Sequence, residues 1–394
     1  MFDVKSEAKK IENEIINWRR ELHQIPEIHD NLPLTTAYVK ECIKKEGLEY
    51  KEYSNGGITC VVRGKQDGQT IGFRADMDAL PVKEETGLPF ASKNENMHAC
   101  GHDAHTAMLI GAMKILNAHK DELNGNVVCI FQPAEETTGG AKIMVDEGCL
   151  DDPKVDRFIS LHIGSLFETV DNGKIGVKKG PMMAGVSSFY VTVKGKGGHG
   201  ARPNECVDPI LISCEMIQSL QKIVSREISP THGAVVTVGQ IHGGTIVNVI
   251  PDEVSFSGTI RTLTPEDADY IEKRIKEMLP EIAKANRATA SIQYMNFYPP
   301  TVNDNEVADF FSSAAEKIVG KENVVDIEEP IMGTEDVTYY IRHTKGNYGI
   351  LGSWKKHSDG EYYPHHNPRF HIDESVLWIG SAVFCQCAID FLNK

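Results

Sequence analysis

The order of predicted strands and helices changes near residue 185 and changes back after Pro300. Between these points the residue patterns predict strand, helix, two strands, helix and strand, which is the order of a ferredoxin-like unit. Outside them, short β-rich runs alternate with helical segments, as is typical of an α/β layer with a largely parallel sheet. We therefore expect a larger α/β/α domain, residues 1–185 and 301–394, with an inserted ferredoxin-like (βαββαβ) domain, residues 186–300.

Individual elements follow from hydrophobic periodicity and from helix-start signals. Ile11, Ile15, Trp18 and Leu22 recur at helical spacing, so a first helix should end before Pro26. In the larger domain we expect further helices at 35–46 and 103–119, and strands at 58–62, 70–75, 127–131 and 158–162. In the inserted domain we expect strands at 188–193, 234–241, 254–261 and 290–295, and helices at 209–227 and 264–286.

Charge and composition exclude several classes of protein. The 394 residues carry 41 Lys and Arg against 56 Asp and Glu, a net charge of −15, which argues against a nucleic-acid binder that needs a basic face. We expect no membrane span, because no uninterrupted run reaches the roughly 18 apolar residues that a span needs. The charged N-terminal segment has no apolar signal core. The nine scattered cysteines are typical of reduced thiols, so we expect a cytoplasmic protein without a membrane partner.

The segment from Met97 to His105 holds three histidines, a cysteine and an aspartate within nine residues. Cys100 and His102 are two residues apart, so on extended backbone their side chains share a side. Thiolate and imidazole bind zinc, manganese, cobalt or nickel, which makes this pair the first candidate for metal ligation. Asp103 is left open between a role at the site and a cap on the helix that follows it.

Adjacent carboxylates follow an apolar run that should be a buried strand. Glu135 and Glu136 follow residues 127–131 after a Gln-Pro-Ala segment, at a sheet edge where α/β proteins form their sites. Neighbouring side chains diverge, so one carboxylate can ligate a metal while the other acts as general base on a bound water. A solvated turn is the alternative that this pair leaves open.

Four further residues complete a candidate site. Asp76 and Asp78 end a predicted strand and share a side, which suits a carboxylate that orients a ligand, although turn acids before a proline are the alternative. His162 ends another strand, and His366 lies in a His-His-Asn-Pro segment. Together with Cys100, His102 and Glu136, these two histidines make five ligands of suitable types, a number that suits two ions and a bridging water rather than one closed structural zinc.

At this point the sequence resembles a known family, the cysteine-containing amidohydrolases of the aminoacylase and carboxypeptidase superfamily. That branch includes hippurate hydrolases, bacterial aminoacylases, N-acetyldiaminopimelate deacetylases and plant auxin-conjugate hydrolases. The resemblance covers nearly the whole chain. It rests on the segments at residues 19–27, 74–81, 97–105, 131–136, 195–203, 248–251, 258–261, 333–336 and 364–370.

The resemblance implies a role for each matching position. It implies that the metal ligands are Cys100, His102, Glu136, His162 and His366. Glu135 matches the general base and Asp78 the orienting carboxylate, while Asp76 falls where other relatives place a ligand histidine and could share that orienting role. His199, Asn248 and Arg261 match substrate-binding positions of the inserted domain.

The activity that the resemblance implies is cleavage of the amide bond of N-acyl L-amino acids, a small-molecule substrate. Two divalent ions per chain are implied, Mn²⁺ or Zn²⁺ first, with Ni²⁺ or Co²⁺ also open, and so is a homodimer through the inserted domain. Two alternatives stay open: a dipeptidase or carboxypeptidase of the same superfamily, and a non-catalytic metal-containing binding protein. Thr334 stands where relatives more often have serine, and Val337 where they more often have an aromatic residue.

Overall fold

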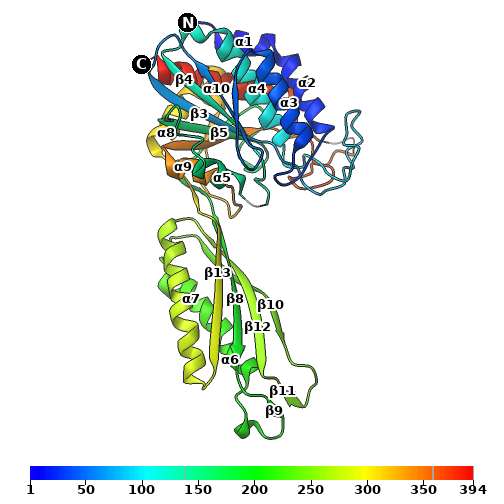
Figure 1. Cartoon of the computed structure of the whole chain (residues 1–394), viewed down its shortest axis with the longest axis vertical. Helices are drawn as coiled ribbons and strands as arrows, with labels where there is room; N and C mark the ends of the chain where they lie inside the picture. Colours follow the sequence, from blue (N-terminus) through cyan, green and yellow to red (C-terminus); the bar gives the residue numbers. More distant parts are fainter. Residues whose placement is uncertain (138, 357–358, 394) are drawn as a thin grey trace. The chain divides into compact units, whose positions relative to one another are not determined.

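The computed structural model describes residues 1–137, 139–356 and 359–393 and divides into two compact units (Figure 1). The larger unit comprises residues 1–180, 303–329 and 336–394, and the smaller unit comprises residues 181–302 and 330–335. The sequence placed these divisions after residues 185 and 300. The short segment 330–335, which the sequence analysis assigned to the larger domain, groups with the smaller unit.

The larger unit is built on one mixed β-sheet. Its strands are β1 (Tyr50–Glu52), β2 (Ile58–Arg63), β3 (Gln69–Asp76), β4 (Gly125–Gln132), β5 (Arg157–Gly164), β6 (Ile175–Val177), β15 (Val324–Asp326) and β16 (Gly346–Gly352). They lie in the order β1-β2-β4-β3-β5-β16-β6-β15. The four central strands β4, β3, β5 and β16 are parallel, whereas β2 and β6 join them antiparallel. The expected parallel sheet is therefore confirmed at the centre and is mixed at the edges.

Buried central strands explain the continuous apolar runs of the sequence. All eight residues of β4 are buried, as are seven of the eight in β3. A strand covered on both faces has no solvent side, so it shows no alternation of apolar and polar residues. Candidate site residues of the sequence analysis lie at the ends of these two buried strands.

Helices cover both faces of this sheet. They are α1 (Val4–Lys10), α2 (Glu12–His23), α3 (Pro33–Lys45), α4 (His102–Ala118), α5 (Gly140–Asp146), α8 (Asn305–Val319), α9 (Thr338–His343) and α10 (Leu377–Leu392). Helices α1, α2, α4, α8 and α10 pack on one another on one side. Helices α5 and α9 pack together and touch β4 and β16, apart from the first group (Figure 1). The predicted α/β/α layering is thus present.

The C-terminal helix corrects one sequence expectation. Residues 374–392 are long and apolar enough to cross a membrane by length and composition, with a mean hydropathy of 1.6, and the sequence reading overlooked them. In the structure 83% of this stretch is buried, because α10 packs against α4, α8 and α1. The segment is a core helix of the larger unit.

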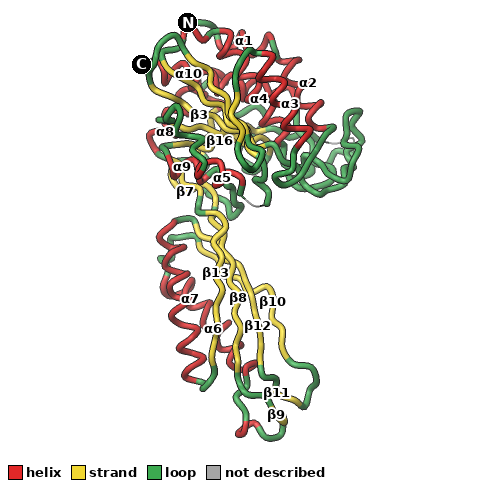
Figure 2. Tube along the Cα trace, in the orientation of Figure 1, coloured by secondary structure: helices red, strands yellow, loops and turns green. Residues whose placement is uncertain are grey.

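The smaller unit is a four-stranded antiparallel sheet with two helices. Its elements are β8 (Gly185–Lys194), β9 (Gly198–His199), α6 (Pro209–Lys222), β10 (Ala234–Gly243), β11 (Val249–Ile250), β12 (Glu253–Thr262), α7 (Pro265–Ala285) and β13 (Thr289–Tyr298). The sheet order β10-β12-β8-β13 is that of a ferredoxin-like fold, and both helices lie on one face (Figure 2). Short strands β7 (Gly180–Met183) and β14 (Thr301–Asn303) pair where the chain enters and leaves this unit.

Local signals explain where these elements begin. Thr264 caps α7 by accepting from the backbone N–H of Asp267, and Pro265 opens the helix as predicted. Along β8 every second residue is buried, because one face of the sheet meets the helices. The helix predicted over 209–227 is α6 followed by a π-helical turn, Ile223–Glu227.

Candidate metal centre and active site

The candidate site lies where the parallel central strands of the larger unit end. Asp76 is the last residue of β3, Glu135 and Glu136 follow β4, and His162 lies near the end of β5. The long loop after β16 carries His366. Parallel strands end at one sheet edge, so residues far apart in the sequence meet there.

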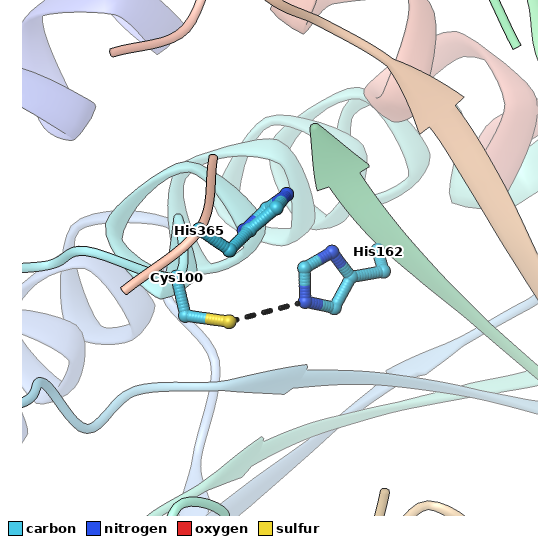
Figure 3. A group of neighbouring side chains, drawn as sticks. All are labelled: Cys100, His162 and His365. Carbon is cyan, nitrogen blue, oxygen red and sulfur yellow. Dashed lines mark hydrogen bonds between the residues drawn. The ribbon is translucent and has the colours of Figure 1, made fainter. Parts of the chain in front are cut away.

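The loop before α4 brings Cys100 and His102 to this edge. The Cys100 Sγ lies 3.4 Å from the His162 Nε2, and the two side chains point toward one another (Figure 3). Gly101 between them has a φ of +93°, and a Cβ there would lie 2.8 Å from the Ile163 Cγ2. Only glycine suits both the backbone conformation and the close approach to β5, which explains the Cys-Gly-His order.

The two histidines are oriented alike by backbone carbonyls. The His102 Nδ1 donates to the carbonyl of Asp78 at 2.9 Å, and the His162 Nδ1 donates to the carbonyl of Ile163 at 2.7 Å. A neutral imidazole that donates from one nitrogen offers a lone pair at the other, which is how metal-binding histidines are usually held. The buried Nε2 of His102 has no hydrogen-bond partner among the described residues, as expected of an atom that serves a metal.

Glu136 and His366 complete the cluster that the sequence predicted. Cys100, His102 and Glu136 offer ligand atoms within 4.8 Å of one another, and the His366 Nε2 lies 3.2 Å from the Glu136 Oε1. The backbone N–H of His366 donates to the carbonyl of Ala99 at 2.9 Å, which ties the late loop to the cysteine loop. The structure thus brings all five predicted ligands together.

The electrostatics of the cluster favour a cation. Burial alone would lower the pKa of His102, but the carboxylates of Asp76, Asp78 and Glu136 outweigh burial and raise this pKa to about 10. By contrast, burial and the neighbouring His105 and His365 hold the pKa of His162 well below its usual value. A negative pocket that also contains neutral imidazole and a thiol is a donor set that fits divalent transition metals.

One carboxylate holds the two adjacent glutamates. The Asp78 Oδ1 accepts from the backbone N–H of Glu135, and its Oδ2 accepts from that of Glu136, both at 3.1 Å. The preceding residue, Ala134, has a φ of +60°, so the chain turns sharply as it leaves β4. Glu135 is only 7% exposed. Asp78 therefore fixes the backbone of both glutamates at the end of β4.

Asp76 takes part in a buried ion pair beside the cluster. Its Oδ2 accepts from the Arg74 Nη1 at 2.9 Å and its Oδ1 from the His105 Nδ1 at 2.5 Å. Burial would raise the pKa of Asp76, but the charges of Arg74 and His102 hold it well below its ordinary value. Arg74 also donates to Asp336 at 2.7 Å. The Asp76 Oδ2 lies 3.4 Å from the His102 Nε2, so Asp76 contacts the cluster through His102.

Several of these partners were missed by the sequence reading. His105 lies on α4 three residues after His102, a helical spacing that could have placed both on one side. Asp336 accepts from Arg74, from the Gln132 side chain at 2.7 Å and from the backbone N–H of Ala141 at 2.9 Å. No local signal connects positions 204 residues apart, so only the fold reveals that contact.

Asp103 takes neither of the two roles that the sequence left open. The helix α4 has Gly101 as its N-cap, with no side-chain cap hydrogen bond. Asp103 instead accepts a hydrogen bond from the His23 Nδ1 at 2.7 Å and forms an ion pair with Arg19, whose Nε lies 2.7 Å from the same Oδ2. The Arg-Arg-Glu-Leu-His segment of the family pattern therefore anchors α2 to the start of α4.

The three candidate residues of the smaller unit, His199, Asn248 and Arg261, lie in two different parts of that unit. His199 ends β9 and Asn248 precedes β11, and these short strands pair, with the Gly200 N–H donating to the Asn248 carbonyl at 2.9 Å. Arg261 lies near the far end of β12, paired with Val186 of β8. The structure brings His199 and Asn248 together and places Arg261 elsewhere on the unit.

Comparison with known proteins agrees with this architecture. The model of peptidase family M20/M25/M40 matches residues 72–390, and the chain belongs to this family. It is similar to an N-acetyl-L-cysteine deacetylase of Bacillus subtilis, 39% identical over 98% of this chain and 89% of the relative. A thermostable carboxypeptidase of Saccharolobus solfataricus is 38% identical over 99% and 98%. An IAA-amino acid hydrolase of Arabidopsis thaliana is 37% identical over 96% and 87%.

A solved structure supports the fold. A dinuclear metal-binding peptidase of the M20 family from Bacillus subtilis superposes with a TM-score of 0.82, at 32% identity over 98% of this chain and 99% of that one. These relatives hydrolyse amide bonds. The protein is therefore a hydrolase of amide bonds in the cysteine-containing aminoacylase and carboxypeptidase branch, as its motifs predicted.

Proposed function

We propose that the enzyme cleaves the amide bond of N-acyl L-amino acids and releases a carboxylic acid and a free amino acid. The observation that carries the proposal is the Asp78 carboxylate, which holds Glu135 and Glu136 so that one joins the ligand cluster while the other stays outside it. The similarity to an N-acetyl-L-cysteine deacetylase and to an IAA-amino acid hydrolase supports an acyl amino acid as the substrate class.

We infer that the cluster holds two divalent cations, Mn²⁺ or Zn²⁺ first among them. The residues that would hold them are Cys100, His102, Glu136, His162 and His366. The dinuclear relative supports this inference, and so do the Nδ1–H bonds of His102 and His162 to backbone carbonyls, which leave the Nε2 of each ring for a cation. When bound, such ions lower the pKa of a coordinated water and polarise the substrate carbonyl.

The protein's own side chains supply the proton chemistry and the positioning. The Glu135 carboxylate removes a proton from the attacking water and returns it to the leaving nitrogen. Asp78 fixes the direction of that carboxylate through the backbone N–H of Glu135. In the smaller unit, His199 and Asn248 are candidates for contact with the substrate. Arg261, whose pKa is lowered by burial, is the candidate partner of a substrate carboxylate.

A carboxypeptidase or dipeptidase is the second candidate, favoured by the 38% identity to a thermostable carboxypeptidase. The two candidates differ in what stands on the acyl side of the bond, an acid without an amino group or another amino acid. A non-catalytic binding protein would have no use for a buried Glu135 beside the cluster.

The deciding experiment measures amine release from N-acetyl, N-benzoyl and longer N-acyl amino acids and from dipeptides. The protein is assayed as purified, after removal of metal by a chelator, and after restoration with Mn²⁺ or Zn²⁺. Turnover of acyl amino acids that disappears on stripping and returns with metal supports the proposal. A kcat/KM for dipeptides that is ten-fold or more above that for acyl amino acids would favour the second candidate, a carboxypeptidase or dipeptidase.

We also propose a homodimer formed through the smaller unit. Ile246 and Val247 in its loop before β11 and Val249 in β11 are exposed, with relative exposures of 60%, 104% and 46%. Exposed apolar side chains in one short segment are typical of an interaction surface. Light scattering after size exclusion should give the mass of two chains for the wild type and the mass of one chain for Val247→Asp. A monomeric wild type would refute the proposal.

A further inference from the structure

His365 lies beside Cys100 and His162 although the sequence motifs assigned it no role (Figure 3). The three residues offer ligand-type atoms within 4.8 Å of one another. The His365 ring lies 5.2 Å from that of His162 and 4.4 Å from that of Phe370, measured between centroids. By position alone His365 could be a sixth metal ligand, so its hydrogen bonds decide what it can do.

One nitrogen of the His365 ring already accepts a hydrogen bond. The backbone N–H of Ser165 donates to its Nε2 at 3.1 Å. The preceding Gly164 has a φ of +119°, and a Cβ at that position would lie 2.2 Å from the same Nε2. The end of β5 is therefore shaped around this nitrogen, which acts as a hydrogen-bond acceptor.

Because its Nε2 accepts a hydrogen bond, the tautomer of His365 is determined. A neutral imidazole has one donor and one acceptor, so His365 carries its proton on Nδ1. His162 is the reverse, since its Nδ1 donates to a carbonyl and its Nε2 lone pair faces Cys100. The N–H of His365 is therefore on Nδ1, and the ring has no lone pair left for a metal.

The Nδ1 of His365 has no completed hydrogen bond among the described residues, and it is shielded from solvent. The backbone carbonyl of Cys100 also faces this ring, but its geometry does not complete a bond with Nδ1. A buried donor without an acceptor is costly. The strongest acceptor available in the cluster is the sulfur of Cys100 in its thiolate form, which metal binding requires.

We propose that His365 is a positioning residue whose Nδ1–H donates a hydrogen bond to the Cys100 thiolate and so strengthens metal binding. This inference rests on the proposed metal site. Hydrogen bonds to a ligating sulfur withdraw charge from it and fix its direction, and loss of such outer partners typically costs 10- to 100-fold in metal affinity.

Three substitutions at one position test the proposal. In His365→Asn the side-chain amide falls near Nδ1 and keeps a donor there, whereas in His365→Gln it falls near Nε2. His365→Leu removes both nitrogens. Co²⁺ alone is added to chelator-stripped protein, and two quantities are measured: the near-ultraviolet thiolate-to-cobalt absorption band, and the Co²⁺ affinity by competition with a chelator.

The expected result separates the variants by donor position. His365→Leu and His365→Gln should shift the thiolate band to longer wavelength, because the sulfur regains charge, and should weaken Co²⁺ binding about ten-fold. His365→Asn should keep the wild-type band and lie within about two-fold of wild-type affinity. Circular dichroism of the metal-free proteins checks folding, and if His365→Leu does not fold, the Asn and Gln pair carries the test.

Other results overturn the proposal in distinguishable ways. An unmoved band in both His365→Leu and His365→Gln would mean that the N–H serves the Cys100 carbonyl and not its sulfur. Equal losses of Co²⁺ affinity in His365→Asn and His365→Gln would mean that His365 contributes only through packing. A wild-type protein whose cobalt spectrum has no thiolate band would refute Cys100 ligation itself, and with it the proposed metal site.

Discussion

The Oδ1 of Asp76 and the Nδ1 of His105 share a buried hydrogen bond of 2.5 Å, while the backbone N–H of Ile163 donates to the other ring nitrogen of His105 at 2.8 Å. Arg74 pairs with the second oxygen of the same carboxylate. The end of β3 is therefore connected to the residue that follows His162. A disturbance of Asp76 should reach the metal cluster through this connection.

Asp76→Asn should lower the free energy of unfolding by about 3–5 kcal/mol, because Arg74 and His105 lose a buried anionic partner. Urea unfolding of the metal-free protein, followed by circular dichroism, measures the change. The matched control is Asp309→Asn, an exposed aspartate paired with Lys179, which should change stability by less than about 1 kcal/mol. Equal effects of the two substitutions would contradict the buried role of Asp76.

Glu135→Gln should lower kcat by about 10²- to 10⁴-fold and leave metal content near that of the wild type, since it removes the general base and no ligand. Glu136→Gln is the matched comparison and should lose metal as well as activity. Activity assays and metal analysis by mass spectrometry give both values. Near-normal turnover in Glu135→Gln would sink its assignment as the base.

Cys100→Ser should weaken metal binding, because a hydroxyl is a much poorer ligand than a thiolate at neutral pH. Cys214 is the exposed cysteine among those described, so Cys214→Ser serves as the control and should bind metal as the wild type does. Stoichiometry after dialysis against a weak chelator distinguishes them. Full retention of both ions by Cys100→Ser would exclude Cys100 as an essential ligand.

Glu374 predicts a pH dependence of stability away from the site. Burial would raise its pKa, but hydrogen bonds from Arg20 and the charges of Arg19 and Arg20 outweigh burial and lower it below 4.5. A carboxylate whose pKa is lower in the folded state stabilises fully above its unfolded pKa, and this contribution is lost as the pH falls through the folded value. The stability difference between wild type and Glu374→Gln should therefore be about 1–3 kcal/mol at pH 7 and shrink below about pH 4.5.

Urea titrations of both proteins between pH 7 and pH 3.5 measure that difference. Glu95→Gln, which alters an exposed pair with Lys83, should differ little from wild type at either pH. A difference for Glu374→Gln that does not change with pH would show that its ion pairs with Arg19 and Arg20 do not contribute to stability.

Much of the fold was predictable because its signals are local. The apolar runs of β3 and β4, the proline-started helix α7 and the change of pattern near residue 185 each need only a short window of sequence. The helix α10 was overlooked because continuous apolar composition has no periodicity to detect. The antiparallel edges of the larger sheet depend on pairing between distant strands, which residue patterns do not encode.

The candidate site was predictable for a different reason. Its ligands are rare residue types concentrated in short segments, so Cys100, His102 and the two glutamates are visible without the fold. Their supports are not visible, because Asp336 reaches Gln132 across 204 positions and Arg19 reaches Asp103 from another helix. Sequence therefore indicates the candidate groups, and the structure shows which residues contact them.

The Asp78 carboxylate has a consequence for the choice of metal. Because its two oxygens accept from the N–H groups of Glu135 and Glu136, it holds the backbone of both glutamates in place. If ions of different radius were bound through Glu136, its side chain would have to adjust while the backbone of Glu135 stayed where it is. Exchange among first-row metals should then alter how tightly the ion is held more than it alters the geometry of proton transfer.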